Sequence, residues 1–146
     1  MFLGRYEHTI DEKGRLNIPA RYRDLFIERS QGRLVLTCFD SCIEAYPLDE
    51  WRHLEEKLKT LSLFQKDVRT FSRLVYSSAA ECTLDSQGRI LIPAHLREMA
   101  QLGRDVTLAG AFNRMEIWSR ERWNSFYGES YPHLPQLAQK LAELGL

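Results

Sequence analysis

The chain has 146 residues, which suits one domain or two intimately joined halves. Its apolar fraction of 44% and charged fraction of 27% are ordinary for a soluble globular protein. The formal net charge is zero, so the totals alone count against nucleic-acid binding, for which a basic domain is usual. Apolar runs are far shorter than the roughly 20 residues of a membrane helix, and no signal-peptide pattern is visible. We therefore expect a cytoplasmic protein without a membrane partner.

The chain contains an internal repeat. Residues Asp11–Ala20 align with Asp85–Ala94 at an offset of 74 (85 − 11), and both segments end in Ile-Pro-Ala. Further on, the offset falls to 72 (116 − 44), so an intervening loop is two residues shorter in the second copy. The later matches are Glu44 with Glu116, Tyr46 with Trp118, and Trp51 with Trp123. This shared order of motifs indicates a duplication.

Each copy begins with a strand, a turn and a second strand. Residues 3–10 mix β-forming and polar residues, and residues 11–14 (Asp-Glu-Lys-Gly) form a type I turn pattern. Such a loop commonly closes a hairpin with a glycine bulge, so a hairpin with the strand at residues 15–18 is expected. Pro19 then fits the first turn of a short helix that runs through Phe26.

A second strand pair follows in each copy. In the first copy, Leu34–Phe39 and Cys42–Tyr46 are strand-like and are joined by Asp40-Ser41. Their counterparts in the second copy are Asp105–Ala109 and Arg114–Trp118.

Apolar residues at helical spacing predict further helices. In the second copy, Ser119 is a candidate N-cap for a helix through Trp123 and Tyr127. The three other stripes are Trp51, Leu54, Leu58 and Leu61; Phe64, Val68, Phe71 and Val75; and Leu134, Leu137, Leu141 and Leu144.

These elements predict an α+β fold. One copy of about 60 residues can bury only a marginal core, so the two copies are expected to meet strand against strand. The predicted product is a small pseudo-twofold β-barrel with surrounding helices, in which the two Asp-x-x-Gly-Arg turns occupy equivalent places. The expected units are a first repeat at 1–62, a connecting helix at 63–77, a second repeat at 78–128 and a C-terminal helix at 129–146.

The sequence offers no constellation for catalysis or metal binding. The odd number of cysteines (Cys38, Cys42 and Cys82) argues against a disulfide framework, and the favoured interpretation is small residues buried in strands. The histidines lack metal-ligand spacing, and no nucleophile elbow or phosphate loop is present. We expect no catalytic residue, metal, cofactor or small-molecule substrate.

At these motifs the chain resembles the MraZ family of bacterial transcriptional regulators, which belongs to the AbrB-like, swapped-hairpin barrel class. The resemblance covers nearly the whole chain and includes two Asp-x-x-x-Arg motifs in register. The segments that carry it are Met1–Gly4, Asp11–Arg23, Tyr46–Trp51, Asp85–Arg89 and Phe112–Trp118.

The resemblance implies a specific role. It implies a protein that binds short direct repeats of double-stranded DNA in the promoter of the division and cell-wall gene cluster, including its own gene. It also implies that the protein acts mainly as a repressor at the nucleoid and assembles into a ring-shaped homo-oligomer. Multivalent binding by such a ring would offset the neutral charge of each subunit.

The Asp-x-x-x-Arg motifs would face the DNA in this family. On this chain they place Arg15 and Arg89 at the DNA, and the planar guanidinium is well suited to the O6 and N7 acceptors of guanine. Asp11 and Asp85 would orient these arginines through a charge-assisted hydrogen bond. Gly14 and Gly88 allow the turns. At the turn tips, Lys13 would contact phosphate, and Gln87 would contact phosphate or a base edge.

Other interpretations of these residues remain open. A single Asp-x-x-Gly segment is more often only a hairpin turn, and an exposed Asp–Arg pair is often a weak surface ion pair. Trp51 and Trp123 are better read as helix anchors than as base-stacking groups. Arg21, Arg23 and Arg97 suit a solvated helix face, although the matched Arg23 and Arg97 could bind phosphate or bridge subunits. The alternative function is a non-enzymatic protein-interaction or antitoxin-like module on the same fold.

Overall fold

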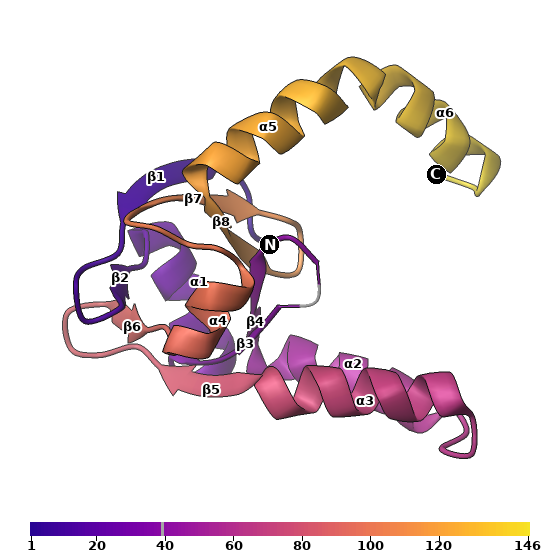
Figure 1. Ribbon diagram of the computed structural model, residues 1–146, viewed down its shortest axis with the longest axis horizontal. Helices are drawn as coiled ribbons and strands as arrows, with labels where there is room; N and C mark the ends of the chain where they lie inside the picture. The colour runs from indigo at the N-terminus through magenta and orange to yellow at the C-terminus, as the bar shows by residue number, and fades with distance from the viewer. Residues whose placement is uncertain (39) are drawn as a thin grey trace.

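Two β-sheets form the body of the protein, seen in a computed structural model that describes residues 1–38 and 40–146 (Figure 1). The larger sheet has six antiparallel strands in the order β1-β7-β8-β4-β3-β5, and the smaller pairs β2 with β6. The strands are β1 (Arg5–Thr9), β2 (Arg15–Asn17), β3 (Arg33–Thr37), β4 (Ile43–Pro47), β5 (Ala80–Thr83), β6 (Arg89–Leu91), β7 (Asp105–Gly110) and β8 (Met115–Ser119).

The two copies exchange strands. The first strand of each copy pairs with the other copy, since β1 lies against β7 and β5 against β3. The pairs β2–β6 and β4–β8 also join the copies. When each strand is replaced by its counterpart, the order of the larger sheet reads the same from the opposite end, which gives the copies a pseudo-twofold relation. Strands β1 and β5 end the larger sheet, so the AbrB-like swapped-hairpin barrel remains a prediction.

The predicted pairing of the two strands on either side of the first turn is wrong, since β1 pairs with β7 and β2 pairs with β6. In the described residues its two sides form no continuous ladder: an isolated bridge joins Ile10 to Leu16, and the Asp11 N–H donates to the Arg15 carbonyl at 3.0 Å. Strand β2 pairs with β6 instead, because this pairing brings the fully buried Leu16 opposite Ile90 in one shared core. The second strand pairs, β3–β4 and β7–β8, are confirmed, except that Phe39 lies outside the described residues.

Helices surround and extend this body. They are α1 (Ala20–Ser30), α2 (Leu48–Lys59), α3 (Lys66–Ser78), α4 (Ala94–Met99), α5 (Arg120–Ser130) and α6 (Leu134–Glu143), with a 3-10 turn η1 (Tyr131–His133) before α6. Ser119 is confirmed as the cap of α5, since its side chain accepts the N–H of Arg122. No helix in the described part of the chain is long and apolar enough to cross a membrane.

Several helix limits differ from expectation. Helix α1 continues four residues beyond Phe26 (30 − 26), and Pro19 precedes it as the N-cap residue. Leu61 and Phe64 fall between α2 and α3, and the Phe64 side chain is 95% exposed. The segment expected as one C-terminal helix is the end of α5, η1 and α6, with prolines near the start of η1 and α6, where a missing N–H is tolerated.

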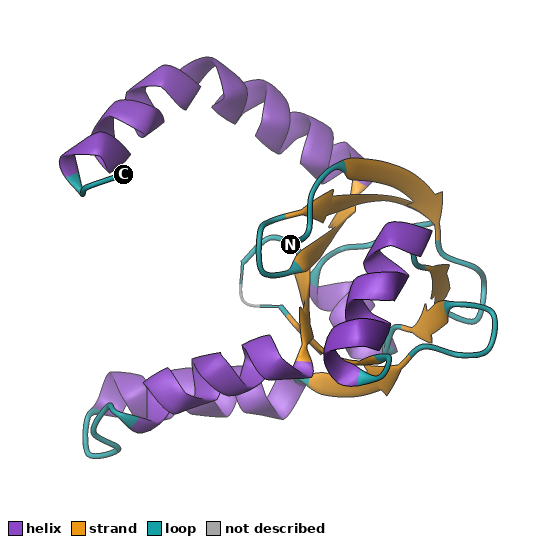
Figure 2. Ribbon diagram, turned by 180° about the vertical axis from the view of Figure 1, so that it is seen from behind, coloured by secondary structure: helices purple, strands orange, loops and turns teal. Residues whose placement is uncertain are grey.

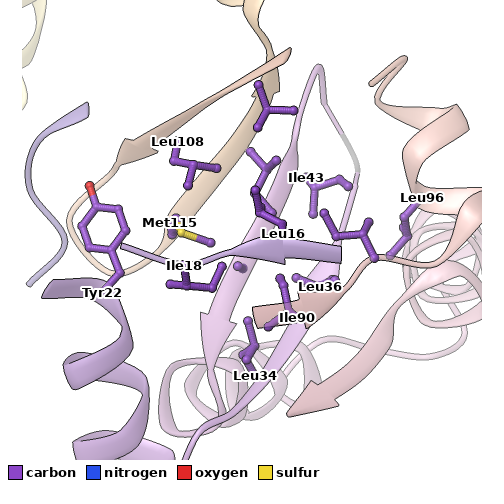
Figure 3. Close-up of a cluster of buried hydrophobic side chains, with 14 of the residues drawn as sticks. Leu16, Ile18, Tyr22, Leu34, Leu36, Ile43, Ile90, Leu96, Leu108 and Met115 are labelled. Atoms are coloured by element: carbon purple, nitrogen blue, oxygen red, sulfur yellow. The ribbon is translucent and has the colours of Figure 1, made fainter. Parts of the chain in front are cut away.

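The core lies between the sheets and α1. Leu16 and Ile18 of the first copy share one core cluster with the matching Ile90 and Ile92 of the second, and all four are at most 2% exposed. Figure 3 shows Leu16, Ile18 and Ile90 in this cluster. The buried hydroxyl of Tyr22 is satisfied by the carbonyls of residues 3 and 4, at 2.8 Å each. Residues on both sides of this core therefore come from both copies.

Two helical arms leave the body on the side away from the β1–β2 and β5–β6 loops (Figures 1 and 2). One arm is the hairpin of α2 and α3, and the other is α5 followed by α6. The four leucines of the α6 stripe are 46–83% exposed. The loops between β1 and β2 and between β5 and β6 are thus free of helical cover from the arms.

Candidate nucleic-acid interface

The first Asp–Arg turn is built around the carboxylate of Asp11. Its Oδ1 accepts the backbone N–H groups of Lys13 (3.0 Å) and Arg15 (2.8 Å), and its Oδ2 accepts the Nε–H of Arg15 at 2.7 Å. The N–H of Gly14 closes the turn onto the Asp11 carbonyl at 3.0 Å. Gly14 has a φ of 86°, which glycine adopts without steric cost. The turn itself is therefore as predicted.

The second turn repeats this arrangement. Asp85 accepts the backbone N–H groups of Gln87 (2.8 Å) and Arg89 (2.9 Å), and its other oxygen accepts the Nε–H of Arg89 at 3.0 Å. Gly88 has a φ of 75°. The two turns therefore present their arginines with the same local geometry, despite different residues at their tips.

Hydrogen bonding keeps both aspartates ionised. The backbone N–H of Arg15 is the largest influence on the pKa of Asp11 and lowers it, and Arg89 acts likewise on the pKa of Asp85. Each carboxylate engages only the Nε edge of its arginine. Within the described residues, the terminal amino groups of Arg15 and Arg89 make no hydrogen bond, so each guanidinium keeps a donor edge for an external acceptor.

The β2–β6 ribbon sets the two arginines on one side. Arg15 is the register partner of Leu91, and Arg89 is the register partner of Asn17. The central pair of this three-residue ribbon faces the core, so the pairs on either side of it point outward. Both arginine side chains are partly exposed, at 33% and 23%. The two turns consequently flank one short ribbon at the edge of the molecule opposite the arms (Figure 1).

Each turn is also contacted by an arginine of the other copy. The guanidinium of Arg97, on α4, lies over Gly14, where an added Cβ would stand 3.0 Å from the Arg97 Cζ. The side chain of Arg23, on α1, lies over Gly88 and would overlap an added Cβ. Both arginines are half-buried, and neither forms an ion pair within the described residues. The sequence match at offset 74 pairs these arginines, but it does not reveal that each sits on the opposite copy's turn.

A cleft of about 590 Å³ opens beside the first turn. Asp11 and Glu12 form one side, and Arg97 and Arg104 contribute cationic side chains. Arg104 was not among the residues singled out from the sequence. The Arg104 carbonyl accepts the N–H of Ile10 at 2.8 Å, which places Arg104 beside the turn, and no local sequence signal announces this long-range contact.

The remaining predicted groups are placed as follows. Lys13 and Gln87 are exposed at the turn tips. Trp51 packs between Tyr46 and Tyr76, with ring centroids 6.0 and 5.7 Å away. Trp123 lies 5.4 Å from Trp118 and belongs to the α5 arm. The tryptophans therefore anchor helices, as the sequence interpretation favoured.

The three cysteine thiols are not activated as nucleophiles. Burial raises the pKa of the Cys38, Cys42 and Cys82 thiols, so they stay protonated at neutral pH. All three are free, and Cys38 and Cys42 are buried beside the strand pair as expected. Among the residues that the structure describes, no group of three or more His, Cys, Asp or Glu could hold a metal ion.

Comparison with known proteins covers the whole chain. The family model of the MraZ protein, which its description likens to antitoxins, matches twice, at residues 1–74 and 75–142. Proteins named transcriptional regulator MraZ from Heliobacterium modesticaldum and Desulfitobacterium hafniense are each 47% identical over 146 residues, covering all of both chains. The same name is borne by a protein of Caldanaerobacter subterraneus subsp. tengcongensis, 47% identical over 97% of this chain and 96% of its own. The chain therefore belongs to the MraZ family.

Proposed function

We propose that this protein is a DNA-binding transcriptional regulator whose two Asp–Arg turns read promoter DNA. The observation that carries the proposal is the pair of matching turns that flank one outward-facing ribbon, each with a free guanidinium edge. The relatives' common name, transcriptional regulator, supports it. That name also favours a non-enzymatic role.

We assign the site residues roles that are compatible with this geometry. Arg15 and Arg89 donate to base edges in the major groove, while Asp11 and Asp85 hold them in place. Lys13 contacts phosphate, and Gln87 contacts phosphate or a base edge. A ring of subunits would repeat these contacts along direct repeats, so that avidity offsets the zero net charge of each chain.

We also propose a specific target and effect for this regulator. The DNA target is a set of direct repeats in the promoter of the division and cell-wall gene cluster, including this chain's own gene, and the effect is mainly repression in the cytoplasm at the nucleoid. The functional units are the repeats at 1–62 and 78–128, joined at 63–77 and followed by the segment 129–146. The exposed leucines of the α6 stripe support assembly into a homo-oligomeric ring, because burying an exposed apolar stripe against another subunit removes it from water and stabilises the assembly.

A mobility-shift titration tests this function. The full chain is titrated onto a duplex carrying the region upstream of its own gene and onto a shuffled duplex of equal length, at several salt concentrations. We expect tighter binding of the upstream duplex and an affinity that falls steeply with salt, as phosphate contacts require. Equal and weak binding of both duplexes would instead favour the protein-interaction module.

A further inference from the structure

We infer that each DNA-reading turn is a composite of both copies, in which Arg97 binds a DNA phosphate beside Arg15 and Arg23 does so beside Arg89. The inference rests on the proposed DNA-binding function and adds phosphate-binding residues to it. Its basis is the reciprocal contact of Arg97 with Gly14 and of Arg23 with Gly88.

Arg97 is held at the first turn by its backbone surroundings. Its Nε–H donates to the carbonyl of Ile92 at 3.1 Å, and the N–H of Ile92 donates to the carbonyl of Gly14 at 2.9 Å. This leaves the terminal amino groups of Arg97 without a hydrogen-bond acceptor among the described residues. Gly14 is buried although it lies in an exposed turn, because the guanidinium covers it.

Within the described residues Arg97 forms no ion pair with either acidic residue of its cleft, which leaves its terminal amino groups for an external anion. Asp11 lines the same cleft, but its oxygens already accept two backbone N–H groups and the Nε–H of Arg15. Glu12 is the other acidic group of the cleft, which also contains the two cationic residues Arg97 and Arg104. A phosphate is the anion that DNA would bring to this place, and arginine binds it through a planar fork.

The two composite turns are unequal. Arg104 corresponds to Gly32, since its carbonyl bonds to the N–H of Ile10 and that of Gly32 bonds to the N–H of Leu84. The first turn therefore has Arg104 where the second has a glycine, in addition to Lys13 in place of Gln87. We accordingly expect Arg97 to contribute more to DNA affinity than Arg23.

The first test compares charge-matched variants of the full chain. DNA binding is measured by fluorescence anisotropy with the upstream and the shuffled duplex, for Arg97→Gln and for Arg73→Gln as control. Arg73 is exposed on the α3 arm, and its side chain forms no ion pair with any described residue. We expect Arg97→Gln to weaken binding of both duplexes by about tenfold and to reduce the salt slope by about one, with Arg73→Gln unchanged. Equal effects of the two variants would overturn the inference.

Arg97→Lys separates phosphate binding from a structural role. Lysine keeps the charge but cannot reproduce the flat contact over Gly14 or the Nε–H bond. Restoration of most of the affinity by Arg97→Lys supports a phosphate contact. If Arg97→Lys loses as much affinity as Arg97→Gln, Arg97 only supports the turn and the inference is wrong. The same conclusion holds if both variants bind DNA weakly and also unfold at a clearly lower temperature than the wild-type chain.

A double-variant experiment tests the pairing across the copies. In an Arg89→Ala background, adding Arg23→Gln should cost little further affinity because both act at one turn, whereas adding Arg97→Gln should retain its full effect. The opposite pattern would show that arginines act within their own copy. If the wild-type chain binds neither duplex, the proposed function fails; if it binds and only Arg15→Ala weakens it, the function stands and this inference fails.

Discussion

Glu44 and Glu116 are direct register partners on β4 and β8, so matching carboxylates of the two copies face each other across the pseudo-twofold relation. Arg114 joins them, with Nε 2.7 Å from Glu44 Oε1 and Nη2 2.9 Å from Glu116 Oε2. Burial raises the pKa of Glu44, while Arg114 lowers it. The position that matches Arg114 in the first copy is Cys42 (114 − 72), so the duplication departs from symmetry where two like charges require a cation.

We expect Arg114→Met to destabilise the protein by about 3 kcal/mol at pH 7, because it leaves a buried carboxylate pair uncompensated. The folded state favours the protonated form of a carboxyl whose pKa is raised on folding. Such a carboxyl therefore destabilises the folded state more as the pH rises from the unfolded pKa through the folded pKa. The loss should therefore be smaller at pH 4.5 than at pH 7. Urea denaturation at both pH values measures it, with Arg69→Met on α3 as control; a loss independent of pH would contradict the assignment.

Gly110→Ala should also be destabilising. A Cβ at Gly110 would stand 2.5 Å from the backbone carbon of Phe2, which cannot move aside like a flexible side chain. We expect a loss of about 2 kcal/mol, measured by chemical denaturation. Gly103→Ala is the matched control, because a Cβ there meets nothing within 4 Å. Similar stabilities of the two variants would show that the approach of the N-terminal segment to β7 is looser than described.

Arg15→Ala should abolish specific binding of the upstream duplex, since it removes the guanidinium from the turn that carries Lys13. Arg89→Ala should weaken binding less, by about tenfold, because Gln87 leaves the second turn with less charge. Mobility shifts, with circular dichroism and light scattering to confirm fold and mass, provide the comparison. An equal or larger loss for Arg89→Ala would refute this ranking.

Asp11→Asn tests whether the aspartate positions the arginine. An amide oxygen can still accept the two backbone N–H groups, but the amide NH₂ would face the Nε–H of Arg15 and cannot accept it. DNA affinity should fall while the melting temperature changes little. Because the pKa of Asp11 is lowered, protonation of the wild-type carboxyl should not disturb binding between pH 7 and pH 5. Tighter DNA binding by Asp11→Asn would mean that the carboxylate mainly repels phosphate.

Deletion of residues 134–146 should reduce the size of the assembly if the α6 leucines pack between subunits. Leu134, Leu137, Leu141 and Leu144 are 46–83% exposed in the single chain. Light scattering of the full and shortened chains gives the mass directly. Replacing Gln136, which is also on α6, with Glu serves as a control that changes the helix but keeps all four leucines. An unchanged mass after the deletion would remove α6 from the interface.

The repeat made much of this fold predictable. Matching motifs identified both Asp–Arg turns and the strand pairs β3–β4 and β7–β8, and the capping preference of serine identified Ser119, because each depends on residues close together in the sequence. Partners from distant segments could not be read in this way. The turn at residues 11–14 has the sequence of a hairpin loop, yet its strands pair with the other copy, since shared burial of Leu16 and Ile90 outweighs local pairing.

In the candidate site, too, local contacts were predictable from the sequence and long-range contacts were not. Asp11 and Arg15 lie four residues apart, so their hydrogen bond follows from the turn alone. The position of Arg97 over Gly14 depends on β2–β6 pairing, and Arg104 reaches the site through the loop before β7. Neither contact has a local signal, because both join segments more than eighty residues apart in the chain (97 − 14, 104 − 10).

The exchange of strands has a consequence for synthesis of the chain. When the first copy leaves the ribosome, β1 and β3 still lack the neighbours they will find in β7 and β5. Their unpaired edges persist until the second copy has emerged, and such edges readily pair with other chains. We therefore expect that neither copy folds alone and that folding is slow, because it must wait for contacts between distant segments. A chain truncated after the first copy should aggregate, or borrow its missing strands from a second molecule.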